Sequence, residues 1–141
     1  MSLNYDDCLK RGKIKPFSRG KELSNKELEE AILDFERARK TYSEGDYKWA
    51  VIQLYYAMFH SARALLYKEN LREHSHFCLL TAIRELYVNK NKLPLHLLEG
   101  LQEAKTLREE ADYYSRWTKQ GCEKLLKIAE EFIDKSKGLI K

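Results

Sequence analysis

His60 and Arg63 lie one helical turn apart within residues 49–67, a segment that is apolar almost all the way round. An imidazole can transfer protons near neutral pH, and a guanidinium can hold a phosphate through directed hydrogen bonds. Charged groups on so apolar a helix need partners, because an unpaired buried charge is costly. The two side chains therefore either bond to neighbouring helices as a structural pair or line a functional groove, and the sequence leaves both alternatives open.

A second group of basic side chains, Arg72, His74 and His76, lies where another helix is expected to begin. The amino end of a helix offers free N–H groups and a positive dipole, which suit an anion such as phosphate. His74 and His76 are two residues apart and would diverge on a helix, so no metal site is expected. His76 is the better candidate for a fixed role, whereas Arg72 and His74 equally fit a solvated loop.

Arg108 and Asp112 form a third candidate group, because a spacing of four places them on one face of a helix. Such a pair adds only about 0.2–0.5 kcal/mol when it is exposed. If this face points into a groove beside His60 and Arg63, the pair becomes a cationic site with an orienting carboxylate. Tyr113 would then be placed to stack on a ligand or to hydrogen-bond with it.

Basic residues also gather in the first 22 positions, beside Phe17, at Lys10, Arg11, Lys13, Lys15, Arg19 and Lys21. Such a run could follow a phosphate backbone, although a solvated, flexible tail is the commoner outcome. The chain has neither a glycine-rich phosphate loop nor a His-Glu-x-x-His motif. No standard catalytic signature is present, and no cofactor is expected.

The composition is that of one soluble domain, with 141 residues of which 43% are hydrophobic and 34% charged. A net charge of +4 permits an acidic partner without requiring one. Cys8, Cys78 and Cys122 show no paired spacing, so we expect buried thiols rather than a disulfide or a zinc site. No signal peptide or membrane-spanning run is evident, so we expect a cytoplasmic protein without membrane contact.

The periodicity of the apolar residues predicts five helices and no strand. A basic, irregular segment, residues 1–22 with a possible helical turn at 5–9, precedes a helical domain at 23–138. Ser24 and Glu27 have the spacing of a capping box, Gly45 and Asp46 mark the first helix–helix junction, and residues 135–141 are expected to fray. The helices are expected at about residues 24–44, 46–69, 75–88, 94–114 and 118–134.

The connections between these helices are short, which makes neighbours antiparallel. The expected fold class is therefore all-α. It is an antiparallel up-and-down bundle of four long helices with a shorter fifth helical element.

Residues 45–66, with the segment Tyr-Tyr-Ala-Met-Phe-His at 55–60, resemble the central helix of small prokaryotic HEPN-domain proteins. Residues 69–76 and 108–113 follow in that family's order, so the resemblance covers about residues 24–135. It implies a helical bundle that is often dimeric, a groove for nucleotides or RNA, and a nucleotidyltransferase partner.

Some members of that family are metal-independent ribonucleases in toxin–antitoxin systems. They use an arginine followed, after a short polar spacer, by a histidine. Here Arg108 matches the arginine, and Tyr113, preceded by Asp112, stands at the histidine position. A tyrosine, with an unperturbed pKa of about 10, cannot replace an imidazole as an acid or base near pH 7.

The leading hypothesis is a dimeric, non-enzymatic module that binds a nucleotide or single-stranded RNA. Arg63, His76 and Arg108 would contact phosphate, and Asp112 would orient Arg108. His60 would supply a hydrogen bond, and the ring of Tyr56 or Tyr113 would stack on a base.

Two alternatives remain open on the sequence. One is an endoribonuclease in which Arg108 stabilises the pentacoordinate phosphate and His60 or His76 moves protons. The other is a structural interaction module whose polar residues only satisfy one another.

Overall fold

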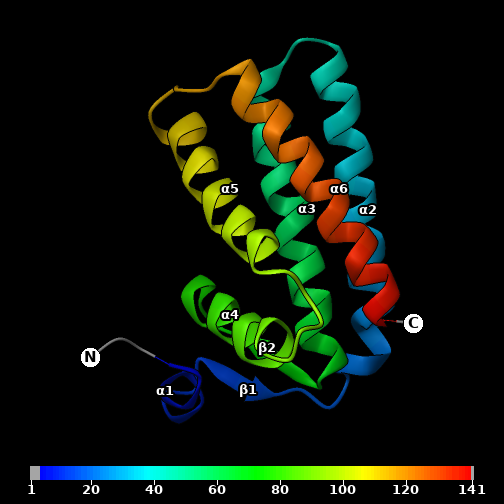
Figure 1. Cartoon of the computed structure of the whole chain (residues 1–141), viewed down its shortest axis with the longest axis vertical. Helices are drawn as coiled ribbons and strands as arrows, with labels where there is room; N and C mark the ends of the chain where they lie inside the picture. The colour runs from blue at the N-terminus through cyan, green and yellow to red at the C-terminus, as the bar shows by residue number, and fades with distance from the viewer. Residues whose placement is uncertain (1–3, 141) are drawn as a thin grey trace.

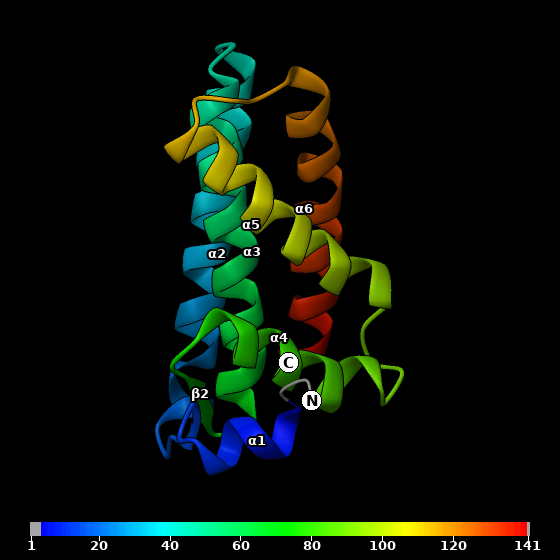
Figure 2. The ribbon, with the colours of Figure 1, turned by 90° about the vertical axis from the view of Figure 1, so that its left-hand side faces the viewer.

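The computed structural model describes residues 4–140 and confirms the all-α antiparallel bundle (Figure 1). Four long helices form the bundle: α2 (Gly20–Ser43), α3 (Tyr47–Lys68), α5 (Leu95–Tyr113) and α6 (Lys119–Ile140). The remaining elements gather at one end of it (Figure 2). They are α1 (Tyr5–Lys10), β1 (Ile14–Pro16), β2 (Leu71–Glu73), α4 (His76–Ile83) and a π-helical turn, η1 (Arg84–Val88).

Helix α3 is the centre of the bundle, packing against α2, α5 and α6. Its buried side chains come from every side of the helix, as its two apolar stripes predict. The predicted junctions around it are confirmed. Gly45 has a φ of 80°, the Asp46 carboxylate accepts a hydrogen bond from the Trp49 N–H, and Asn70 closes α3 with a φ of 55°.

The predicted start of the first long helix is wrong, because α2 already begins at Gly20. Ser24 is buried inside α2, and its hydroxyl donates to the Ala64 carbonyl of α3 over 2.8 Å. The predicted fraying of the carboxyl end is also wrong for the described residues, since α6 continues to Ile140. Lys68 Nζ donates to the Ile140 carbonyl over 2.8 Å, which ties this end to α3. Lys141 lies outside the described residues.

The basic N-terminal segment folds onto the bundle instead of extending as a tail. The turn predicted at residues 5–9 is present as α1, capped by Asn4. The prediction of no strand is wrong, because β1 pairs antiparallel with β2, with Ile14 opposite Glu73. Each strand has only three residues, too short for an alternating pattern to be recognised in the sequence.

The expectation of three free cysteines is wrong, because Cys8 and Cys78 form a disulfide between α1 and α4. Both residues are fully buried, and 70 positions separate them in the sequence. Cys122 stays a free, buried thiol on α6, and its burial raises the pKa to about 11. Among residues 4–140, no helix combines the length and apolar character needed to span a bilayer.

Candidate functional site

Arg108, on the last turns of α5, is surrounded by tyrosines. Its Nη2 donates to Tyr56 Oη of α3 over 3.1 Å, and its Nη1 donates to Tyr113 Oη over 3.3 Å. Its Cζ lies 5.3–5.8 Å from the ring centroids of Tyr55, Tyr56 and Tyr113. The predicted pair with Asp112 is present at 3.3 Å. The structure therefore brings together Arg108, Asp112, Tyr113 and Tyr56.

This cluster combines a fixed cation with rings that face solvent. The aromatic faces stabilise the guanidinium, and the carboxylate of Asp112 restricts its orientation. Arg108 Nε is buried and has no hydrogen-bond partner among the described residues. Tyr113 is 64% exposed, and Tyr56 is also open to solvent. The arrangement can hold an anion at the guanidinium while an aromatic ring stacks on one of the flanking tyrosines.

His76 begins α4, as predicted, with Ser75 as the N-cap. Its Nδ1 lies 3.2 Å from Tyr55 Oη, and its ring stacks on Phe59 at a centroid distance of 6.2 Å. Burial, together with the positive charge of Lys105, lowers the pKa of His76 to about 4. The imidazole is therefore neutral at pH 7. It can offer a hydrogen bond to a phosphate but no positive charge.

Tyr55 links His76 to the Arg108 cluster, and it was not among the candidates chosen from the sequence. Its hydroxyl lies next to His76, and the Cζ of Arg108 is 5.8 Å from its ring centroid. Burial, with the nearby Tyr56, raises the pKa of Tyr55 to about 12, so the hydroxyl keeps its proton. The feature of the sequence that could have identified Tyr55 as a site residue is its place in the Tyr-Tyr-Ala-Met-Phe-His segment.

His60 and Arg63 point to a different set of partners. His60 Nδ1 lies 2.5 Å from Glu27 Oε1 of α2, and its Nε2 lies 3.7 Å from Asp34. Arg63 Nη2 donates to Glu73 of β2 over 2.7 Å, and its Nη1 lies 3.6 Å from Glu27. Of the two alternatives for this pair, the contacts match bonding to neighbouring elements. Glu27, predicted to be part of a capping box, is instead a partner of both cations.

The pair His60 and Arg63 and the group of His76 with the Arg108 cluster do not form a single cationic cluster. Among the described residues, they are linked only through the ring of Phe59. The Cζ of Arg63 lies 4.5 Å from the Phe59 centroid, and Phe59 in turn stacks on His76. Among residues 4–140, no hydrogen bond joins Arg108 directly to a histidine. In the same range, no group of three or more acidic, cysteine or histidine side chains is arranged to hold a metal ion.

The contact between His60 and Glu27 makes a pH-dependent contribution to stability. The hydrogen bond that His60 donates to the Glu27 carboxylate raises the pKa of His60 against the opposing effect of burial. Because the pKa of His60 is higher in the folded than in the unfolded protein, its protonation stabilises the folded state. This stabilisation is fully present below the unfolded pKa of about 6.5 and is lost as the pH rises through the folded pKa. We expect His60→Asn to lower the free energy of unfolding by about 1–2 kcal/mol at pH 6 and by less at pH 9. Urea unfolding at both pH values measures this, and an equal loss at both would contradict it.

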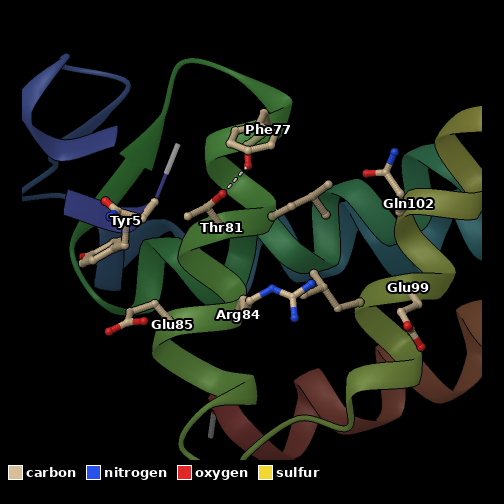
Figure 3. A pocket seen from close by; sticks show the side chains of 10 residues that line it. Tyr5, Phe77, Thr81, Arg84, Glu85, Glu99 and Gln102 are labelled. Atoms are coloured by element: carbon tan, nitrogen blue, oxygen red, sulfur yellow. Dashed lines mark hydrogen bonds between the residues drawn. The ribbon is translucent and has the colours of Figure 1, made fainter. Parts of the chain in front are cut away.

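A cavity of about 530 Å³ lies apart from the Arg108 cluster, between α4, η1, α5 and the start of α1 (Figure 3). It is called the separate cavity below. Arg84 extends from η1 toward α5, which carries Glu99 and Gln102, and Phe77 lies on the outer side of α4. None of the site residues predicted from the sequence lines this cavity. Phe77 and Arg84 therefore offer an exposed aromatic ring and a cation away from the Arg108 cluster.

Comparison with known proteins places this geometry in a family. The model of the HEPN domain matches residues 25–139. The putative toxin MJ0142 of Methanocaldococcus jannaschii is 30% identical over 78% of this chain and 76% of its own length. The putative toxin MJ0605 of the same organism is 29% identical over 86% of this chain and 97% of its own. A UPF0332 protein of Archaeoglobus fulgidus is 31% identical over 84% of this chain and 94% of its own length. The chain belongs to the HEPN domain family.

Proposed function

We propose that this protein binds a nucleotide or single-stranded RNA through the Arg108 cluster without cleaving it. The observation that supports this most strongly is the guanidinium of Arg108 held among three tyrosine rings, two of which are open to solvent. A fixed guanidinium recognises phosphate oxygens, and exposed aromatic rings stack on bases of any sequence. The proposed ligand requires both properties in one place.

The contacts of the two histidines favour binding over proton transfer. The resemblance to HEPN ribonucleases implies that Tyr113 stands at the position of their histidine. His60 is paired with Glu27 and His76 lies next to Tyr55, and within residues 4–140 neither histidine hydrogen-bonds to Arg108. General acid–base catalysis needs a group of suitable pKa within hydrogen-bond reach of the reacting atoms.

The setting we propose is toxin-like, because two relatives are named putative toxins. Within it we propose a homodimer with a nucleotidyltransferase partner, as the resemblance to HEPN proteins implies. Arg63 and His76 remain proposed phosphate contacts. The guanidinium of Arg63 is already paired with Glu73 and lies near Glu27, so its contribution should be smaller than that of Arg108.

We expect Arg108→Ala to weaken binding of a fluorescein-labelled eight-residue oligouridylate by about 10- to 100-fold, because a hydrogen-bonded charge contact is lost. Fluorescence anisotropy at fixed salt measures the dissociation constant. Arg84→Ala removes the same charge near the separate cavity and is the matched control, expected to change affinity less than about threefold. Equal affinities of the parent and the Arg108 variant would refute the assignment of this site.

An endoribonuclease is the second candidate, favoured by one specific observation. His76 Nε2 is buried and without a hydrogen-bond partner among the described residues, and Tyr55 contacts both His76 and Arg108. A shift of Tyr55 on binding RNA would open a path between the imidazole and the phosphate. Incubation of labelled RNA with the protein in EDTA separates the two candidates, because only a ribonuclease cleaves the strand.

A further inference from the structure

A second group of exposed aromatic rings lies at the same end of the bundle as the Arg108 cluster. Trp49, in the first turn of α3, is 50% exposed, and Trp117, in the connection between α5 and α6, is 45% exposed. The ammonium group of Lys48 lies 5.6 Å from the Trp49 ring and 5.8 Å from the Trp117 ring. Two large rings from distant parts of the sequence therefore flank one cation.

This tryptophan pair is aligned with the Arg108 cluster along α3. Trp49 precedes Tyr56 by seven residues, so both lie on the same face of α3, about 10 Å apart along its axis. The turn between α2 and α3 and the connection between α5 and α6 lie at the same end of the bundle in both views (Figures 1 and 2). Tyr114, also exposed, extends the surface, and the guanidinium of Arg116 lies 6.0 Å from its ring.

The chemistry of this surface differs from that of an ordinary solvated helix face. Several large aromatic rings exposed side by side mark an interaction surface, whereas single exposed apolar residues do not. Among residues 4–140, Lys48 has no carboxylate within ion-pairing distance, so its charge is available to a phosphate. Exposed rings alternating with cations are the arrangement that binds single-stranded nucleic acid by stacking and backbone attraction.

We infer that Trp49, Trp117 and Lys48 form a second base-stacking subsite, and that the ligand is single-stranded RNA several nucleotides long. The separation of about 10 Å between Trp49 and Tyr56 is roughly three times the 3.4 Å spacing of stacked bases, so a mononucleotide cannot reach both subsites. The phosphates between the two bases would be held by Lys48 and Arg108. This inference rests on the proposed function, since it extends the same binding surface.

The two tryptophans of the chain are Trp49 and Trp117, so intrinsic tryptophan fluorescence reports on this subsite alone. We expect an eight-residue oligouridylate to quench this fluorescence as it binds. Uridine monophosphate should leave the fluorescence unchanged at concentrations at which it occupies only the Arg108 cluster. Trp49→Ala and Trp117→Ala should each weaken binding of the labelled oligonucleotide by about 5- to 100-fold, the range for loss of one stacked base. Trp49→Phe should retain most of the affinity, because a phenyl ring still stacks.

Phe77→Ala is the matched control, because Phe77 has the same 50% exposure as Trp49 but lies beside the separate cavity. It should leave oligonucleotide affinity unchanged. Circular dichroism of each variant checks that the helices are intact. Uridine monophosphate affinity, measured by calorimetry, should be equal in the parent and in both tryptophan variants.

The outcomes distinguish this inference from the proposed function. Oligonucleotide binding that is lost in Arg108→Ala and unchanged in both tryptophan variants would overturn the second subsite while leaving the proposed function intact. No binding by the parent would overturn both. A fall in molar mass by light scattering on Trp49→Ala, with RNA affinity unchanged, would show that this surface contacts a second copy of the chain, and would also overturn the inference.

Discussion

Arg63→Met is expected to lower the free energy of unfolding by about 3 kcal/mol, because it leaves Glu73 with a buried and unpaired carboxylate. The Glu73 side chain is only 6% exposed and accepts three hydrogen bonds from the Arg63 guanidinium, at 2.7, 3.2 and 3.4 Å. Methionine keeps the length and apolar stem of the side chain, so the loss is mainly that of the charge. Urea unfolding of the parent and the variant at pH 7 measures it.

The double variant Arg63→Met with Glu73→Met separates the ion pair from the packing. Replacing both members of a buried pair with apolar groups is often close to neutral, so the double variant should be more stable than the Arg63 variant alone. Arg72→Met, on an exposed position of β2, is the matched control with an expected change below about 0.5 kcal/mol. Two single losses that add fully in the double variant would show that the pair contributes nothing as a pair. Oligonucleotide affinity of the Arg63 variant tests its proposed phosphate contact.

Cys8→Ala should destabilise the protein by about 2–4 kcal/mol under oxidising conditions, because the Cys8–Cys78 disulfide closes a long loop of the unfolded chain. The bond also holds α1 against α4, two residues after His76. A reductant should lower the unfolding midpoint of the parent toward that of the Cys8 variant and leave the variant itself unchanged. Thermal unfolding with and without the reductant measures both effects.

Cys122→Ala is the control for the disulfide, because it removes the buried free thiol and keeps the bond. Its unfolding midpoint should still fall when the reductant is added. Three free thiols on titration of the oxidised, unfolded parent would show that the disulfide is absent. An unfolding midpoint of the parent that full reduction leaves unchanged would show that the disulfide does not stabilise the protein.

Helix ends governed by local chemistry could be predicted from the sequence. Two helix ends are closed by residues with a positive φ, Gly45 and Asn70. Two helix starts are capped by side chains that accept from an N–H three residues away, those of Asp46 and Ser75. All four residues have their predicted roles. Ser24 has the same residue type as a good N-cap, yet its hydroxyl bonds to a carbonyl of α3. A sequence pattern cannot distinguish these uses, because the partner that decides between them is 40 residues away.

In the candidate site, too, contacts within one helix could be predicted from the sequence, and contacts between distant elements could not. The pair of Arg108 with Asp112 follows from a spacing of four on one helix, and it is present. The contact between Arg108 and Tyr56 joins two helices and depends on how each is rotated about its axis, which periodicity does not define. The pairing of Cys8 with Cys78 required α1 to pack against α4, and no signal in the sequence places that short helix.

The central claim is that the Arg108 cluster binds single-stranded RNA without cleaving it. The most direct test incubates the parent and Arg108→Ala with the same labelled RNA in EDTA, and measures anisotropy and strand integrity in each sample. We expect the parent to bind the RNA and leave it intact, and the variant to bind more weakly and also leave it intact. Cleavage by the parent that disappears in Arg108→Ala would contradict this account and establish a metal-independent ribonuclease.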